Sequence, residues 1–230
     1  MSEATTETPR QTSPASNGLK LLLTMGSVGF IAGILIVYTF QTTMPYIKAN
    51  EAAFLEQAIF SILPGTTYRK TFTVNDDGSL KAIKADDPVT YKIYAGYNKQ
   101  HQLTGVAVEA KGQGFQDVVS IIYGYDPEKK AVIGMKVLQS TETPGLGDKI
   151  NSDVKFHANF DFLDVRLNQL GTALLHPIAL IKGPRKEKYQ ISAITGATIS
   201  STAVTKMMEK SAEKNIPLIE KNIELLKEDK

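Results

Sequence analysis

Residues 103–140 read LTGVAVEAKGQGFQDVVSIIYGYDPEKKAVIGMKVLQS and contain three β-rich runs. A glycine-rich stretch separates the first run from the second, and the turn-forming sequence DPEKK separates the second from the third. Connections this short suit antiparallel strands, because a parallel crossover needs about a dozen residues or more. The stretch therefore predicts the middle of an antiparallel sheet.

The flanking segments extend this sheet and add helices. In residues 66–97, TTYRKTFTV and SLKAIK surround the turn NDDG as in a hairpin, and VTYKIYAGY follows as a further alternating strand. IALIKG (178–183) and KYQISAI (188–194) predict two short strands, and STAVTKMMEKSAEKN (201–215) has the spacing of an amphipathic helix. The whole pattern predicts an α+β fold in which helices flank an antiparallel sheet.

A membrane-spanning helix is predicted near the N-terminus. LKLLLTMGSVGFIAGILIVYTF (19–40) has about twenty residues without a charge after Lys20, enough to cross the hydrocarbon core. A cleaved signal peptide is the competing interpretation, but the long preceding tail and the following QTTMPYIK favour an uncleaved anchor. Arg10 and Lys20 precede the span and only Lys48 follows closely, which favours a cytoplasmic N-terminus and an extracytoplasmic main domain.

These signals divide the chain into five segments. Pro64 and Gly65 stop the helical pattern after the span, and Pro217 predicts a break or kink in the last helix. The expected segments are a disordered tail at 1–18, a transmembrane helix at 19–40, a juxtamembrane helix at 41–65, the α+β domain at 66–216 and a C-terminal helical tail at 217–230.

Composition excludes several kinds of site. The 230 residues include 26 basic and 24 acidic ones, so no broad positive field suggests a nucleic-acid partner. The absence of cysteine excludes disulfides, thiolate catalysis and cysteine ligands to zinc or iron–sulfur clusters. His101, His157 and His176 lack metal-ligand spacing. We therefore expect neither a metal site nor nucleic-acid binding.

Two glycine-containing stretches have unusual chemistry but no nucleotide fingerprint. GQGFQD (112–117) has Asp117 where a dinucleotide motif needs its third glycine, and ETPGLGDKI (142–150) lacks the spacing of a P-loop. In the second stretch Pro144 fixes one φ angle, while Gly145 and Gly147 permit positive φ or a close approach of backbone. A tight turn after the preceding strand explains the same residues equally well, so the residue types alone leave its role open.

The stretch ISAITGATISSTAV (191–204) contains a cluster of hydroxyls between a strand and a helix. Helix capping accounts for one or two of them. It does not account for TGAT, in which Gly196 and Ala197 leave the Thr198 hydroxyl approachable by a large partner. The N-terminus of the following helix suits a phosphate, and no histidine–acid pair is present to make Thr198 a hydrolytic nucleophile. The residues therefore predict a phosphate at Thr198.

TGATISS resembles the S/T-G-A-T-x-T/S motif of the FMN-binding domain family, in which a flavin transferase joins FMN to the last threonine through a phosphoester bond. GQGFQDVVSIIYGYDPEKKAVIGMKVLQSTETPGLGDKI also resembles that family, notably the G subunit of the Rnf electron-transport complex. The C subunit of the sodium-translocating NADH:quinone reductase is a close relative. The resemblance assigns the linkage to Thr198. The motif usually carries Asp three residues before its first Ser/Thr, where this chain has Ser192.

The resemblance implies a membrane-anchored electron carrier in the bacterial inner membrane, with the FMN domain on the periplasmic side. Its partners would be the other membrane, iron–sulfur and flavin subunits of an Rnf-type complex, and a flavin transferase would mature it. The chain alone would turn over no substrate. Lys149 and Lys182 are further candidates to stabilise the phosphate or the reduced flavin. The residues expected at the cofactor are Thr195, Gly196, Ala197, Thr198 and Ser200, together with Glu142, Thr143, Gly145, Leu146 and Gly147.

Two other functions remain open at this point. The chain could carry FMN in a sodium-translocating NADH:quinone reductase or another membrane reductase. It could instead be a non-redox extracytoplasmic binding or assembly module in which the hydroxyl cluster only caps a helix.

Overall fold

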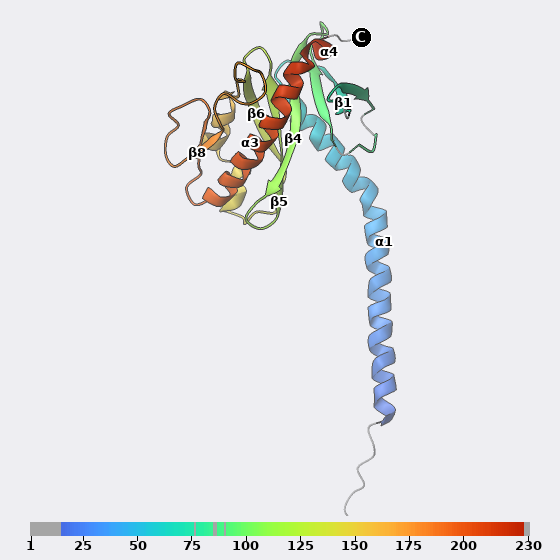
Figure 1. Cartoon of the computed structure of the whole chain (residues 1–230). Coiled ribbons are helices and arrows are strands. Elements are labelled where there is room, and N and C mark those ends of the chain that lie inside the picture. Colours follow the sequence, from blue (N-terminus) through green and yellow to red (C-terminus); the bar gives the residue numbers. More distant parts are fainter. Residues whose placement is uncertain (1–14, 76, 85–86, 90, 228–230) are drawn as a thin grey trace, which may run out of the picture. The chain divides into compact units, whose positions relative to one another are not determined.

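Helix α1 (Ala15–Ile62) is the first element of the computed structural model, which describes residues 15–75, 77–84, 87–89 and 91–227 (Figure 1). The predicted transmembrane segment (19–40) and residues 41–62 of the predicted juxtamembrane segment lie in this one helix, and Pro45 does not interrupt it. Residues 1–14 of the predicted tail lie outside the described residues. The chain divides into two compact units, Met1–Ala52 and Ala53–Lys230. By length and composition, α1 can cross a membrane.

The second unit is built on an antiparallel sheet, as the sequence predicts. Neighbouring strands follow the order β2-β1-β3-β4-β5-β6-β7, and the runs of residues 103–140 are the three consecutive strands β4, β5 and β6. The sheet strands are β1 (Tyr68–Val74), β2 (Leu80–Ile83), β3 (Ile93–Tyr97), β4 (Leu103–Gln113), β5 (Val118–Asp126), β6 (Ala131–Gln139) and β7 (Leu163–Asp164). The α+β class is therefore confirmed, with the predicted hairpin formed by β1 and β2.

The last turns of α1 cover one face of the sheet. Ile59, Ile62 and Leu63 are buried in a cluster with Tyr94 and Ile122. The approach is close: a Cβ on Gly124 would lie 2.7 Å from Leu63 Cδ2. Because adjacent strand residues point to opposite faces, the neighbours of these sheet residues form a separate, larger core on the other side.

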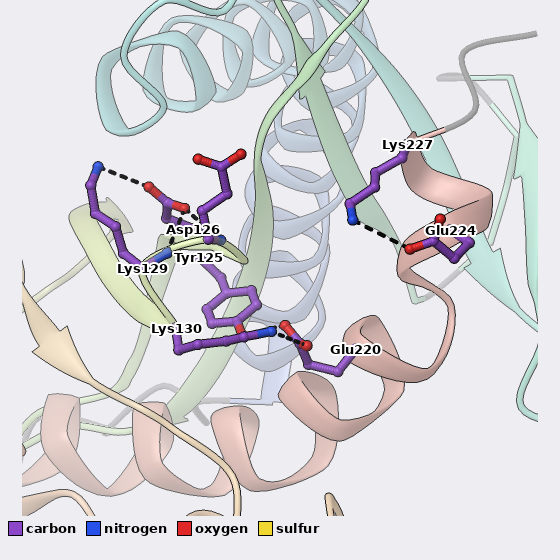
Figure 2. Close-up of polar contacts among 8 residues, drawn as sticks. Tyr125, Asp126, Lys129, Lys130, Glu220, Glu224 and Lys227 are labelled. Atoms are coloured by element: carbon purple, nitrogen blue, oxygen red, sulfur yellow. Dashed lines mark hydrogen bonds and ion pairs between the residues drawn. The ribbon is translucent and has the colours of Figure 1, made fainter.

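Helix α3 (Thr198–Lys221) packs into the larger core (Figure 1). Its buried side chains include Val204, Met208 and Ile216. Near its C-terminal end Glu220 accepts a 2.5 Å hydrogen bond from the Tyr125 hydroxyl and pairs with Lys130 (Figure 2). Burial raises the pKa of Tyr125, as does the nearby Glu220 carboxylate, so the phenol stays protonated and can donate. These contacts attach α3 to the β5–β6 turn.

Helix α3 continues through Pro217 to Lys221, where the sequence predicts a break or kink at the proline. Proline removes only one backbone donor. The buried Ile216 and Ile219 on either side keep this turn of the helix on the core. The short helix α4 (Ile223–Lys227) follows.

The two late strands exist but pair in parallel, unlike the main sheet. Strands β8 (Ala179–Ile181) and β9 (Gln190–Ser192) form a separate two-stranded sheet. The connection is short because it contains no crossover helix. Arg185 holds it through hydrogen bonds to the carbonyl oxygens of Asn159 at 2.8 Å and Phe162 at 2.6 Å. Strand β9 is followed by Ala193, Ile194 and then TGAT (195–198).

The segment between β6 and β7 carries three short helical turns. They are η1 (Gly147–Asn151), α2 (Val154–His157) and η2 (Ala158–Phe160). Ile150, Phe156 and Phe160 anchor these turns in the larger core. The loop ETPGLG is thereby fixed between β6 and a buried 3₁₀ turn.

Candidate functional site

A pocket of about 310 Å³ lies where the two motif loops meet the start of α3. Three segments far apart in sequence form it: the loop at Phe115, the loop at 142–147 and residues 196–200. Its lining consists of Phe115, Glu142, Thr143, Leu146, Gly147, Gly196, Ala197, Thr198, Ile199 and Ser200. A larger groove of about 960 Å³ follows the C-terminal half of α3 and the loop 166–172, and none of the predicted site residues line it.

Most of the predicted site residues line this pocket. The exceptions are Thr195 and Gly145, which lie beside it in the two turns, and the lysines Lys149 and Lys182. The pocket therefore brings together the two stretches that the sequence analysis treats separately, ETPGLG and TGAT. Gly145 and Gly196 have φ angles of 75° and 85°, in the left-handed region where glycine is favoured, and each shapes its turn.

Phe115 and Ile199 line the pocket although the sequence analysis did not select them. Phe115 follows Gly114 in GQGFQD, a stretch that was tested as a nucleotide fingerprint and that contributes to the family resemblance, but from which no site residue was chosen. The available signal in the sequence was a large aromatic residue among turn-forming residues, where no core position is expected. In the structure the Phe115 side chain is 62% exposed. Ile199 is 58% exposed in the first turn of α3, where the strand-to-helix pattern alone does not distinguish a core position from a pocket position.

The Glu142 carboxylate connects all three segments of the pocket. Its side chain is buried at 5% exposure. Oε1 accepts hydrogen bonds from the backbone N–H groups of Phe115 at 2.7 Å and Gln116 at 3.2 Å. Oε2 accepts a bond from the Ser200 hydroxyl, and Gln116 Nε2 donates to Thr143 Oγ1 at 2.9 Å. The carboxylate thus ties the Phe115 loop and the ETPGLG loop to α3.

Gly114 and Gly147 leave room for this carboxylate. A Cβ on either glycine would collide with a Glu142 carboxylate oxygen. A Cβ on Gly147 would also lie 2.7 Å from Ser200 Oγ. Gly147 is therefore required for close approach, whereas Gly145 and Gly196 are required for backbone conformation. The two glycines of ETPGLG have different physical roles.

The start of α3 has no side-chain cap, so the predicted capping role of the hydroxyl cluster is wrong. Ala197 occupies the cap position. Ser201 and Thr202 instead donate to the carbonyl oxygens of Ala197 and Thr198, four residues before them, at 2.9 Å and 2.7 Å. Ser201 and Thr202 lie too far into the helix to cap its first free N–H groups.

Thr198 combines an unpaired hydroxyl with the positive end of a helix dipole. In the described part of the chain, the Thr198 hydroxyl and the N–H groups of Thr198 and Ile199 have no hydrogen-bond partner. Free N–H groups at the start of a long helix are a favourable place for an anion. Thr198 lies in this first turn and is half-buried at the pocket wall.

The residues of the pocket fit a flavin mononucleotide. Phe115, Leu146 and Ile199 expose apolar surface around it, with Leu146 at 52% exposure, as a flat aromatic ring requires. The free N–H groups of α3 and the Thr198 hydroxyl supply donors for a phosphate. Both halves of such a ligand, apolar ring and anionic phosphate, therefore have suitable groups within one pocket.

Comparison with known families agrees with this assignment. The FMN-binding domain family matches residues 114–213, which include every residue that lines the pocket. The resemblance to this family is thereby confirmed. The match begins at Gly114, beside the Phe115 loop, and ends within α3.

Relatives and solved structures extend the similarity over most of the chain. The G subunit of the ion-translocating oxidoreductase complex of Methanosarcina acetivorans is 27% identical over 197 residues, covering 84% of this chain and 92% of the relative. The G subunit of the proton-translocating ferredoxin:NAD(+) oxidoreductase complex of Clostridium ljungdahlii is 26% identical, covering 80% and 84%. The crystal structure of Shewanella oneidensis NqrC has the same fold, with a TM-score of 0.63, 17% identity, and coverage of 78% of this chain and 99% of that one.

Proposed function

We propose that this chain is a membrane-anchored electron-transfer subunit that carries FMN in an Rnf-type ion-translocating ferredoxin:NAD oxidoreductase complex. The observation that carries the proposal is the single pocket that ETPGLG and TGAT form around Thr198. The family match at residues 114–213 supports the cofactor, and the names of the relatives support the type of complex.

In this proposal FMN is attached covalently to Thr198. The Thr198 oxygen forms a bond to the phosphorus of a flavin nucleotide activated as a pyrophosphate. The P–O bond to the departing nucleotide breaks, the hydroxyl proton leaves, and no electron changes hands. The unpaired hydroxyl and the left-handed turn at Gly196, which exposes it, support this linkage.

When bound, FMN supplies the redox chemistry. The chain's own residues hold and surround it. The first N–H groups of α3 bind the phosphate, and the phosphoester prevents loss of the cofactor in either redox state. Phe115, Leu146 and Ile199 provide apolar surface for the ring. The chain passes electrons between neighbouring subunits and turns over no substrate alone.

The denatured protein provides a direct test of attachment. A gel band of the chain co-expressed with a flavin transferase should fluoresce under ultraviolet light, and Thr198→Ala should abolish the fluorescence. Thr202→Ala is a matched control on the same helix, since it removes a hydroxyl that bonds to the Thr198 carbonyl, and its band should stay fluorescent. A fluorescent Thr198→Ala band would disprove the site.

The proposed location is the bacterial inner membrane, crossed once, with a cytoplasmic N-terminus and an FMN domain on the periplasmic side. Arg10 and Lys20 before the span, against Lys48 after it, support this orientation. A reporter that is active only outside the cytoplasm, fused after residue 230, should be active. An active cytoplasmic reporter at that position would reverse the orientation.

The proposed partners are the other membrane, iron–sulfur and flavin subunits of the complex. The alternative host, a sodium-translocating NADH:quinone reductase, has the fold similarity to NqrC in its favour. The sequence relatives favour the Rnf-type complex because they are named as its subunits and cover most of the chain. Purification of the native complex and identification of its co-purifying subunits separates the two.

A further inference from the structure

Glu142 is the only charged residue that lines the pocket in the described part of the chain. Its carboxylate is buried, and its hydrogen-bond partners are two backbone N–H groups and one hydroxyl, all neutral. Burying an anion without a cationic partner is costly compared with burying a neutral amide of the same shape. A glutamine would leave the two bonds to Oε1 in place and remove that cost. Hydrogen bonding alone therefore does not explain why position 142 carries a negatively charged glutamate instead of a neutral glutamine.

We propose that Glu142 is the positioning residue of the flavin site: its carboxylate fixes the Phe115 loop against the first turn of α3 and holds a negative charge at the pocket wall. The inference rests on the proposed FMN function and goes beyond it, because it assigns both carboxylate oxygens to protein donors. Glu142 acts on the flavin through the residues it holds and through its charge.

The geometry supports the positioning role. Donors from two distant segments converge on one carboxylate: the Phe115 and Gln116 amides on Oε1 and the Ser200 hydroxyl on Oε2. Because Gly114 and Gly147 carry no side chain, both can lie against the carboxylate. The exposed Phe115 ring is therefore attached to a backbone that the buried Glu142 holds in place.

The charge has a predictable effect on the flavin. Reduction adds electrons to the ring, so a fixed anion in a partly desolvated wall opposes it and lowers the reduction potential. Glu142→Gln keeps the shape and the acceptor for the two amides, and removes the charge. It should therefore raise the potential.

The positioning role is tested on the full-length chain without flavin. Amide hydrogen exchange over residues 113–117 should be about tenfold faster in Glu142→Ala, because the Phe115 and Gln116 N–H groups lose their acceptor, and close to wild type in Glu142→Gln. Ser200→Ala, which removes one hydroxyl only, replaces Glu142→Ala if that variant does not fold, and should also speed the exchange. Unchanged exchange in the folded variant would overturn the positioning role.

The charge effect is tested on the flavin-loaded chain. Glu142→Gln should raise the ratio of reduced to oxidised flavin at a fixed potential about tenfold, which is a rise of about 30 mV in the two-electron midpoint potential. Glu224→Gln removes an exposed carboxylate paired with Lys227, outside the pocket, and should leave the potential unchanged. A Glu142→Gln potential equal to or below that of wild type contradicts the inference. A chain that accepts no flavin contradicts the proposed function instead, and the exchange measurement still decides whether Glu142 holds the loop.

Discussion

At the scale of single residues, the pocket depends on glycines that lack a side chain as much as on the side chains that line it. Gly147 permits the Glu142 carboxylate and the Ser200 hydroxyl to meet, and Gly196 turns the chain so that Thr198 begins α3 at the pocket wall. Both glycines belong to recognisable sequence motifs. Gly147 is needed because its neighbours approach closely, and Gly196 is needed because its φ angle is positive. Substitutions that add a side chain distinguish these two requirements.

Gly147→Ala should destabilise the domain by about 1–3 kcal/mol, because its Cβ meets the buried Glu142–Ser200 bond. Gly145→Asn is the matched comparison. A side chain at position 145 meets open space, and asparagine tolerates a φ of 75°, so this change should cost less. Thermal unfolding of the detergent-solubilised variants measures both. Equal losses of stability in Gly147→Ala and Gly145→Asn would refute the steric role of Gly147.

Ser192 stands where the flavinylation motif that the sequence resembles usually carries Asp. Its backbone N–H donates to Asn159 Oδ1 at 3.0 Å, and the side chain is half-buried at the end of β9. If a transferase reads an acidic residue here, Ser192→Asp should increase the fraction of chain flavinylated by a transferase from another organism. In-gel fluorescence per unit of protein measures that fraction, with Ser192→Asn as the uncharged control. A lower flavinylated fraction in Ser192→Asp than in Ser192→Asn would show that the transferase does not recognise a negative charge at this position.

The sequence selected Thr198 from its small neighbours and the helix that follows, and the family resemblance added Glu142 and Leu146; all three line the pocket. It did not identify Phe115 or Ile199, because pocket and core positions differ in tertiary contacts and not in residue type. It also assigned capping to hydroxyls that lie inside α3. The first helical residue is Thr198 itself, and boundaries shifted by a few residues change which group a side chain can reach.

At the scale of elements, both faces of the main sheet are covered by helices distant in sequence. The end of α1 packs on one face and α3 on the other. The sequence predicted the strands from their period and the short turns between them. It did not predict the parallel pairing of β8 and β9, because contacts between distant segments, such as the hydrogen bond from Arg185 in their connection to the Asn159 carbonyl, leave no local signal in the sequence.

The end of α1 should be an integral part of the folded domain. Leu63 is fully buried, so Leu63→Ala should destabilise the domain by about 2–5 kcal/mol through loss of buried surface and formation of a cavity. Leu225→Ala, at a partly exposed position in α4, is the matched control and should cost only about 0.5 kcal/mol, as surface changes usually do. Denaturant unfolding compares the two. A neutral Leu63→Ala would mean that the domain folds without this helix end.

The ion pair between Asp164 in β7 and Arg166 should make the stability of the domain depend on pH. Burial alone would raise the pKa of Asp164, but the hydrogen bonds and charge of Arg166 outweigh it, and the net pKa lies below its ordinary 3.8. A lowered folded-state pKa contributes stability above the unfolded pKa, and this contribution is lost as the pH falls through the folded value.

Asp164→Asn should therefore lower Tm at pH 7, and the difference from wild type should shrink as the pH falls below 3.8. The exposed Asp161→Asn on the preceding turn should change Tm little at either pH. Thermal scans across this range measure both variants. If the difference in Tm between wild type and Asp164→Asn stayed constant across this pH range, titration of the ion pair would be ruled out as its source.

At the scale of the whole molecule, the chain combines a helix long enough to span a membrane with a domain whose pocket fits FMN. The similarity to the G subunits of ion-translocating oxidoreductase complexes runs over both units, since the relatives cover most of the chain. Both features are strong in the sequence, because an uncharged span and a glycine–threonine motif are local signals. The meeting of three distant segments at Glu142 is a property of the folded chain only.

The most direct test of the central claim is the mass of the peptide that contains Thr198, taken from protein purified after co-expression with a flavin transferase. We predict an added mass equal to FMN less one water, located on Thr198 by fragmentation and absent from Thr198→Ala. An unmodified Thr198 peptide, or the same added mass on another residue, would contradict the account.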